Sequence, residues 1–260
     1  MKILVANDDG VHFHGLWTLV QELAPFHQIT VVAPDREQSG VGAAISLHRI
    51  LRARPITPPV SGAAAYAVEG TPGDCVILGL SAIAPDTELV ITGINEGSNV
   101  GDDIFISGTV GGALHAYFRG LPAIAASVSS PRSTHYRPAA HIVARLAQAV
   151  AEGQLPGRLL LNVNVPDLPA AEIKGITLTR QARRPYADVF EEKIDSRGKT
   201  YYWLVRRRPE FEVEEGTDIW ALRNGLVSIL SMQSDVRSTG DQSQLRMLCD
   251  LLMGGLRHSE

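Results

Sequence analysis

The chain of 260 residues is 45% hydrophobic and 20% charged, with 24 glycines and 15 prolines, which excludes a disordered chain or a fibrous repeat. Its net charge of −4 gives no basic field, so we expect no binding to long nucleic acid. The length exceeds one usual domain and falls short of two, which predicts one large core with an appended lobe.

Short apolar runs alternate with stretches of helical spacing through the first two thirds of the sequence. In chain order we expect strand 3–6, helix 15–24, strand 29–33, helix 74–81, strand 89–92, helix 110–119, strand 123–127, helix 139–152 and strand 159–163. This alternation predicts an α/β fold over residues 1–170, with a mostly parallel sheet that has helices on both faces. Ligands of such sheets bind beyond the carboxyl ends of the strands.

The character of the sequence changes near Lys174. Two stretches rich in arginine and aromatic residues, 177–186 and 199–208, are typical of antiparallel strands. Residues 241–256 carry an apolar stripe at helical spacing, formed by Leu245, Leu248, Leu252 and Met253. We therefore expect residues 171–260 to form a β-rich appendage and a C-terminal helix that needs a surface to pack on, in one structural unit with the core.

Two adjacent carboxylates follow the first expected strand directly. Asp8 and Asp9 stand where a parallel sheet presents its ligands, and they repel each other unless a cation or hydrogen-bond donors hold them. The alternative is a plain turn, because Asp9-Gly10 is common turn chemistry. The position leaves metal binding and a turn both open.

Two further polar segments follow at strand ends. The loop 93–103 supplies glycines for close backbone approach and the carboxamides of Asn95 and Asn99, although it could equally be an exposed turn. Ser107, Gly108 and Thr109 precede the helix 110–119, and hydroxyls with free backbone N–H groups at a helix N-terminus suit a phosphate. A simple N-cap is the alternative.

Several common motifs are absent from the sequence. The Ser39–Gly42 segment lacks the last glycine of a dinucleotide fingerprint and does not open the first strand–helix turn, which excludes NAD binding by that motif. His12 and His14 are interpreted as exposed loop residues, since no third metal ligand lies near them.

The start of the chain reaches Asp8 too soon for a signal peptide, no apolar run could span a membrane, and cysteine usage fits a reducing compartment. We expect a cytoplasmic protein without membrane contact.

Taken in order, these motifs resemble the SurE (stationary-phase survival protein) nucleotidase family. The resemblance spans nearly the whole chain and includes three later segments, Asn162–Pro166, Arg180-Gln181 with Tyr201–Trp203, and Gly216–Asp218. It implies that residues 1–170 form a Rossmann-like catalytic core. It also implies hydrolysis of nucleoside 5′- and 3′-monophosphates and one divalent cation per subunit, held by Asp8, Asp9, Ser39 and Asn95. It also implies a homodimer or homotetramer with exchanged C-terminal elements.

Hard oxygen ligands favour magnesium, manganese or calcium as that cation. We expect Asp8 and Asp9 to be catalytic, as metal ligands of which one also handles a proton. Phosphate is expected on Asn99, Ser107, Gly108 and Thr109.

Four positions depart from the family pattern. Ile106 replaces a usual Tyr, His115 a usual Glu, Ala116 a usual Gly, and Leu230-Ser231 a usual Thr-Pro. None is a presumed metal ligand. They leave open a second function, a nucleotide-binding regulatory protein with weak or no turnover.

Overall fold

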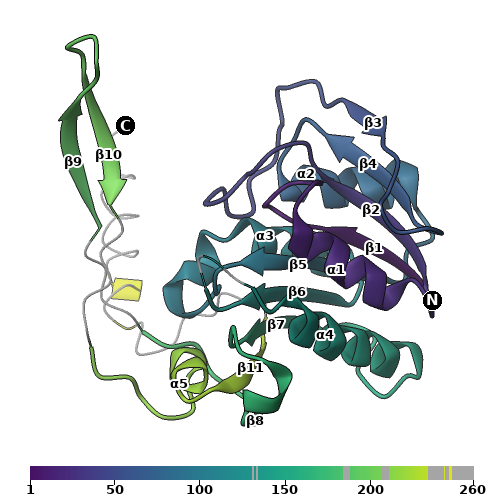
Figure 1. Cartoon of the computed structure of the whole chain (residues 1–260). Coiled ribbons are helices and arrows are strands. Elements are labelled where there is room, and N and C mark those ends of the chain that lie inside the picture. Colours follow the sequence, from purple (N-terminus) through teal and green to yellow (C-terminus); the bar gives the residue numbers. More distant parts are fainter. Residues whose placement is uncertain are drawn as a thin grey trace.

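A nine-stranded sheet forms the centre of the protein, in the order β3-β4-β2-β1-β5-β6-β7-β11-β8 (Figure 1). The computed structural model describes residues 1–130, 132, 134–183, 188–205, 211–233, 243, 246 and 247. The six strands from β4 to β7 run parallel. They are β1 (Lys2–Ala6), β2 (Gln28–Pro34), β4 (Ala64–Val68), β5 (Leu89–Glu96), β6 (Ala123–Val128) and β7 (Leu160–Val165).

Four helices cover the two faces of this sheet (Figure 1). α1 (His14–Leu23) and α4 (Tyr136–Ala151) lie on one face, and α2 (Pro72–Leu78) and α3 (Gly108–Phe118) on the other. The π-helix η1 (Gly79–Ile83) continues α2. Alternation along β1 serves both cores, because Ile3 and Val5 pack with α1 while Leu4 packs with α2 and α3. Strands buried on both faces explain the continuous apolar runs in the sequence.

The two edges of the sheet are not parallel. β3 (Ala53–Pro55) pairs antiparallel with β4, and β11 (Leu226–Ser231) pairs antiparallel with β7. β8 (Gly175–Leu178) then adds to β11 in parallel, after the short helix η3 (Ala170–Glu172). The 3-10 helix η2 (Gly101–Phe105) lies between β5 and α3, and α5 (Asp218–Arg223) precedes β11.

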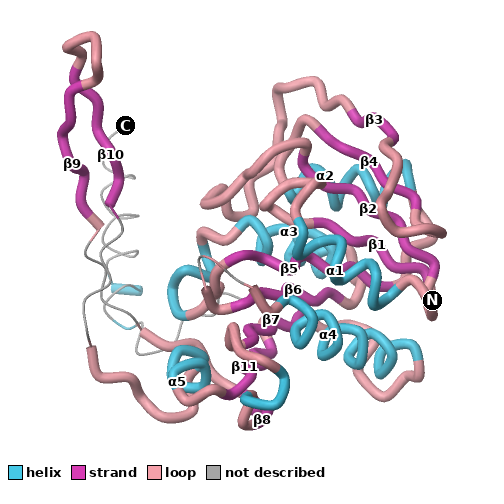
Figure 2. The backbone as a smooth tube through the Cα atoms, in the orientation of Figure 1, coloured by secondary structure: helices cyan, strands magenta, loops and turns pink. Residues whose placement is uncertain are grey.

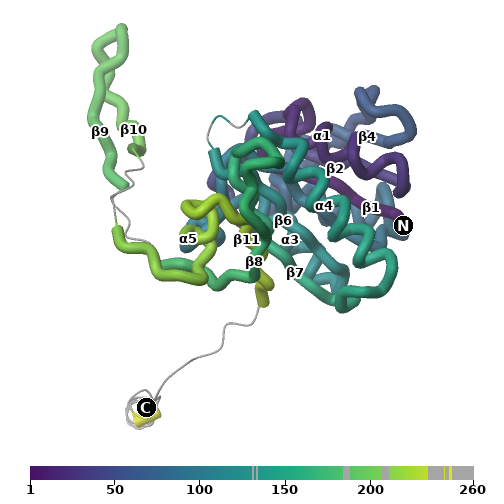
Figure 3. The backbone as a smooth tube through the Cα atoms, turned by 60° about the horizontal axis from the view of Figure 1, so that its bottom comes forward, coloured from purple at the N-terminus to yellow at the C-terminus, as the bar shows by residue number. Residues whose placement is uncertain are grey.

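A two-stranded hairpin stands away from the sheet. β9 (Val189–Ile194) and β10 (Thr200–Val205) pair antiparallel, and the backbone traces show them apart from the core in both orientations (Figures 2 and 3). We call residues 188–205 the hairpin lobe. The chain before and after this lobe is joined at the main fold, because the Asp218 N–H donates to the Arg180 carbonyl at 3.0 Å and the Arg180 N–H donates to the Gly216 carbonyl at 3.0 Å. We call this junction the closed base of the hairpin lobe.

The expected α/β architecture is confirmed, with its mostly parallel sheet, helices on both faces and an added antiparallel hairpin. The sequence does not predict strands β3, β4, β9 and β11, and helix α4 begins at Tyr136 rather than 139. The C-terminal helix expected over 241–256, with its stripe at Leu245, Leu248, Leu252 and Met253, lies outside the described residues. Within the described ranges, none of the helices combines the length and apolar content that crossing a membrane requires.

One predicted pairing is wrong. The stretch 177–186 is expected to be an antiparallel strand, but its first residues belong to β8, which runs parallel to β11 at the edge of the main sheet. The stretch 199–208 does contain an antiparallel strand, β10, whose partner is β9. The physical reason is that β11 pairs with β7 on one side only, so its other edge is open to β8. Among the described strands, β10 has no such edge beside it and pairs only with β9.

Candidate active site

The order of the strands places a crevice between β1 and β5. From β1 the chain first builds outward through β2 and β4, and then returns to add β5 on the other side of β1. At such a switch point the loops after the two strands diverge and leave room for a ligand. A pocket of about 180 Å³ lies there. Its lining residues are Asp8, Ser39, Gly40, Asn95, Glu96, Gly97, Ser98, Asn99, Asp103, Ile106 and Ser107.

Asp8 is the most enclosed acid of the site, with 4% of its surface exposed. The Thr109 backbone N–H donates to its Oδ2 at 3.0 Å, and the Thr109 hydroxyl donates to its Oδ1. Burial raises the pKa of the Asp8 carboxyl, although these two bonds act in the opposite direction. The N-terminus of α3 therefore orients the Asp8 carboxylate through Thr109.

Asp9 lies beside Asp8 with a less crowded carboxylate. The Glu96 backbone N–H donates to its Oδ2 at 3.4 Å, which ties the end of β1 to the end of β5. Burial, followed by the charge of Asp8, raises the pKa of Asp9 to about 8. In the described part of the chain, no Lys, Arg or His forms an ion pair with either acid.

The residues of this region suit a hard divalent cation. A buried and a half-buried carboxylate, with no cationic partner among the described residues, call for a positive charge. The Asn95 amide N–H₂ donates to the carbonyls of Gly97 at 2.6 Å and Glu96 at 3.2 Å, which leaves its side-chain oxygen for another partner. Ser39 donates to Glu37 Oε1 at 2.8 Å, so its oxygen lone pairs can also accept a ligand.

The start of α3 forms the opposite wall of the pocket. Ser107 is the N-cap of the helix, and its hydroxyl oxygen accepts a hydrogen bond from the Val110 N–H at 3.1 Å. A Cβ on Gly108 would stand 2.9 Å from Asp8 Cβ, so only glycine lets the helix approach the acid this closely. Thr109 is fully buried and faces Asp8 rather than the pocket lining.

Asn99 lies deep in the same pocket, with 8% exposure. Its amide N–H₂ donates to the Ser127 hydroxyl at 2.9 Å. Of the eight residues expected to form the site, five line the pocket: Asp8, Ser39, Asn95, Asn99 and Ser107. Asp9, Gly108 and Thr109 lie directly behind that lining and contact it through Glu96 and Asp8.

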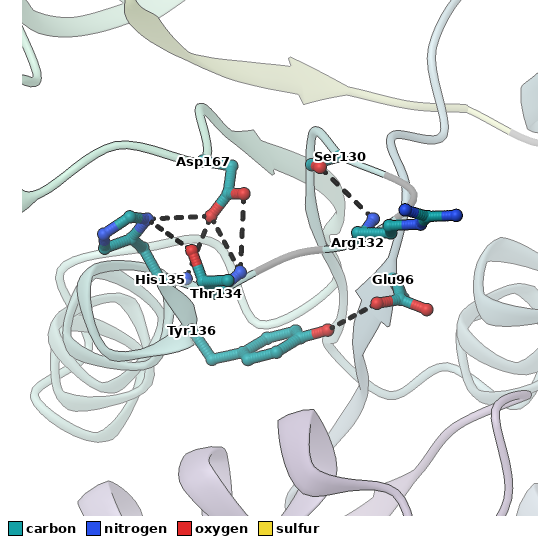
Figure 4. Close-up of polar contacts among 7 residues, drawn as sticks. All are labelled: Glu96, Ser130, Arg132, Thr134, His135, Tyr136 and Asp167. Atoms are coloured by element: carbon teal, nitrogen blue, oxygen red, sulfur yellow. Dashed lines mark hydrogen bonds and ion pairs between the residues drawn. The ribbon is translucent and has the colours of Figure 1, made fainter.

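The start of α4 contacts the lining of the pocket through Glu96. Tyr136 points toward Glu96, and its hydroxyl donates to Glu96 Oε1 at 3.5 Å (Figure 4). Asp167 fixes the start of α4 by accepting the backbone N–H groups of Thr134 at 3.1 Å and His135 at 2.9 Å. The sequence predicts no role for Glu96 or Tyr136, because one sequence does not reveal which residues around a loop face the cavity.

His12 and His14 are exposed, as interpreted from the sequence, and His14 stacks edge-on against Tyr136. Among the described residues, no group of three or more His, Cys, Asp or Glu side chains gathers at a metal-binding distance. A cation at the acidic pair would therefore need oxygen ligands of other types, and Ser39 and Asn95 carry such oxygens in the same pocket.

Comparison with known proteins decides the family. The family model described as "Survival protein SurE" matches residues 3–188. The chain belongs to the SurE family. The SurE-family relatives described as "5′-nucleotidase SurE" include one from Geobacter sulfurreducens, 44% identical over 95% of this chain and 93% of its own length. Another, from Syntrophotalea carbinolica, is 46% identical over 91% of this chain and 92% of its own length.

A solved SurE structure has the same fold. The crystal structure of the SurE protein from Aquifex aeolicus superposes with a TM-score of 0.79, at 35% identity, over 97% of this chain and 100% of that one. Of the positions where this chain departs from the SurE pattern, only Ile106 lines the pocket. His115 makes a hydrogen bond of 2.9 Å with the Ala43 carbonyl, and Ala116 is buried in the core around α3.

Proposed function

We propose that this chain is a 5′-nucleotidase that hydrolyses nucleoside 5′-monophosphates, and also 3′-monophosphates, to nucleoside and phosphate, with the help of one divalent cation per subunit. The similarity to SurE proteins described as 5′-nucleotidases extends over nine tenths of the chain. The observation on which the proposal rests is the buried acid Asp8, which shares one pocket with the helix N-cap Ser107 at the switch point of the sheet.

The cation is proposed to bind Asp8, Asp9, Ser39 and Asn95, which combine two carboxylates with a hydroxyl and a carboxamide oxygen. Magnesium, manganese and calcium all prefer such hard ligands. When bound, the cation would withdraw charge from the phosphate oxygens and so make phosphorus more open to attack by water. It would also supply the counter-charge that the two acids lack among the described side chains.

The chain's own residues bind and orient the phosphate in this proposal. Asn99, Ser107 and the backbone at Gly108 would hold the phosphate oxygens at the start of α3, where N–H groups and the helix dipole favour negative charge. Thr109, expected from the sequence to bind phosphate as well, donates both its N–H and its hydroxyl to Asp8 and would instead orient that acid. Asp9 is better placed than Asp8 to accept a proton, because Thr109 already occupies both oxygens of Asp8. Glu96 keeps Asp9 in place through its backbone N–H.

The test is phosphate release from a panel of nucleoside 5′- and 3′-monophosphates, with Mg²⁺, Mn²⁺ or Ca²⁺ added back after chelation. We expect release that depends on the cation and disappears with EDTA. Tight nucleotide binding without release would instead support the second function, a nucleotide-binding regulatory protein. The exposed Ile106 in the pocket is the observation that keeps this alternative in the test, because it changes the surface against which a substrate lies.

A further inference from the structure

The backbone of Asn99 is held by side chains from a distant strand. Asn164 Oδ1 accepts the Asn99 N–H at 2.8 Å, and Asn164 Nδ2 donates to the Asn99 carbonyl at 3.1 Å. Asn162 Nδ2 donates to the same carbonyl at 2.7 Å. A carboxamide that both accepts and donates copies the pairing that a neighbouring strand would give.

Both asparagines belong to β7 and are fully buried. They are two residues apart, so they share one face of the strand and together reach the loop above it. Buried carboxamides are costly unless they are hydrogen-bonded, and three of the bonds made here end on a single residue of the pocket. The sheet itself does not need these three bonds, because its backbone pairs β6 with β7 without them.

The side chain of Asn99 is fixed by a third element. Ser127 of β6 accepts its amide N–H₂ at 2.9 Å, which ties the side chain to the sheet through one of its two N–H groups. The surrounding loop has little regular structure of its own between β5 and η2. The conformation of the loop at Asn99 is therefore set by side chains of β7, which lie more than sixty residues later in the sequence.

We propose that Asn164, assisted by Asn162, is a positioning residue that sets the orientation of Asn99 toward the substrate phosphate. The proposal deepens the function proposed above and rests on it for the role of Asn99. Neither asparagine lines the pocket, so each acts only through Asn99. Small displacements of a phosphate-binding group reduce the rate strongly, because the group must match the transition state.

The experiment compares Asn164→Ala and Asn162→Ala with a matched control, Ser228→Ala. Ser228 is the register partner of Asn164 on β11, is equally buried, and shares a hydrogen bond of 2.8 Å with Thr179, away from Asn99. All three variants lose a buried polar contact in the same part of the sheet. Only the first two should change the pocket.

We expect Asn164→Ala to lower kcat by about ten- to a hundredfold at saturating Mn²⁺, with an Mn²⁺ affinity within about twofold of wild type. Asn162→Ala should have a smaller effect of the same kind, because it removes one bond and its Oδ1 has no partner in the structure. Ser228→Ala should keep wild-type kcat. Equal losses in all three variants, in proportion to their thermal stability, would overturn the positioning role.

A double-mutant cycle with Asn99→Ala separates positioning from general damage. If Asn164 acts through Asn99, Asn164→Ala should lower kcat by less than about threefold in the Asn99→Ala background. Effects that simply multiply would contradict the proposal. Should Asn164→Ala fold poorly, Asn162→Ala supplies the same cycle with a smaller expected change.

Binding of inorganic phosphate distinguishes this proposal from the proposed function. If the wild-type protein releases no phosphate from any nucleotide, the proposed function fails, but calorimetric binding of inorganic phosphate to the Mn²⁺-loaded protein still tests the positioning of Asn99. We expect Asn164→Ala to weaken that binding by about tenfold or more and Ser228→Ala to leave it unchanged. Unaltered phosphate binding in Asn164→Ala would overturn the proposal.

Discussion

Asp8 and Asp9 place two adjacent carboxyl groups at the end of a buried strand, where water cannot screen negative charge well. Such a pair is destabilising until a cation or a proton neutralises it. We expect Asp8→Asn and Asp9→Asn each to abolish metal-dependent phosphate release while raising the melting temperature of the chelator-treated protein. Glu152→Gln, which changes an exposed carboxylate at the end of α4, is the control and should leave both measurements unchanged. Full activity in both variants would remove the acids from the site.

The raised pKa of Asp9 also predicts how stability depends on pH. The folded, metal-free protein holds a proton on Asp9 up to about pH 8, whereas the unfolded chain releases it near the ordinary value of 3.8. The unfolding free energy should therefore fall as the pH rises between these values. Urea titrations in EDTA from pH 5 to 8.5 would measure this slope, and Asp9→Asn should flatten it.

Metal binding should then displace that proton. Calorimetry of Mn²⁺ binding at pH 7, in buffers with different ionisation enthalpies, should detect close to one released proton in the wild type and less in Asp9→Asn. A heat of binding that is the same in every buffer would show that Asp9 is already ionised without the cation.

Ser107 combines two roles that can be separated. Its oxygen caps α3, which is worth about 1 kcal/mol, and its hydroxyl proton is free to face a phosphate in the pocket. We expect Ser107→Ala to reduce turnover by about ten- to a thousandfold, beyond what the lost cap explains. Thr217→Ala is the matched control, since Thr217 caps α5 through the Trp220 N–H, outside the pocket lining. Unchanged kinetics would leave Ser107 a capping residue alone.

At the scale of the elements, glycine in helix α3 allows the backbone of the helix to contact the backbone of a neighbouring loop. A Cβ on Gly111 would stand 2.2 Å from the Gly42 carbonyl oxygen, so α3 packs directly on the loop that carries Ser39. We expect Gly111→Ala to cost about 1–3 kcal/mol and to weaken Mn²⁺ binding by moving that loop. Gly157→Ala is the control, because a methyl group added there would have no neighbouring atom within 4 Å. Wild-type Mn²⁺ affinity in Gly111→Ala would show that the loop adapts without loss.

The elements differ in how far the sequence predicts them. The parallel strands β1, β2, β5, β6 and β7 are buried on both faces, and the short apolar runs that they contain make them recognisable. Strand β9 contains Glu191, Glu192 and Lys193, so its composition is that of a loop, and only its partner β10 makes it a strand. Strand β4 is rich in alanine, which has little β-propensity, and its place between β2 and β3 stabilises it.

The candidate site shows the same division. The pocket residues Asp8, Ser39, Asn99 and Ser107 follow strands or precede a helix, and Asn95 stands near the end of β5. The rule for parallel sheets is therefore enough to bring them to one edge. The orientation of Thr109 toward Asp8 depends on how closely Gly108 approaches the acid, which is a tertiary detail. Asn162 and Asn164 give a usable signal, since two carboxamides on one face of an apolar strand need partners.

For the whole molecule, the exposed apolar side chains of the hairpin lobe indicate contact with another copy of the chain. Phe190 and Leu204 are cross-strand partners that remain 69% and 47% exposed, and Tyr202 on the same face is 63% exposed. Apolar side chains on a two-stranded hairpin have no core of their own, so we propose that they pack against another copy of the chain, in a homodimer or homotetramer.

We expect the double change Phe190→Glu and Leu204→Glu to lower the mass measured by light scattering. Glu191→Gln with Lys193→Gln, on the opposite face, should leave the mass unchanged. Removing residues 241–260 tests the exchanged C-terminal helix expected from the sequence in the same way, and an unchanged mass in both experiments would contradict the proposed assembly.

The closed base of the hairpin lobe has a consequence for how such proteins can diversify. Asp218 accepts the Ala182 N–H at 3.0 Å and the Gly101 N–H at 2.8 Å, so the chain leaves and re-enters the fold at one fixed point. The segment between residues 182 and 217 is thus an insertion whose two ends already meet. It can be shortened, lengthened or grafted from a relative without shifting β8 or β11. Substitutions in this segment would then change the surface that is offered to another copy of the chain, without changing the residues that line the pocket between β1 and β5.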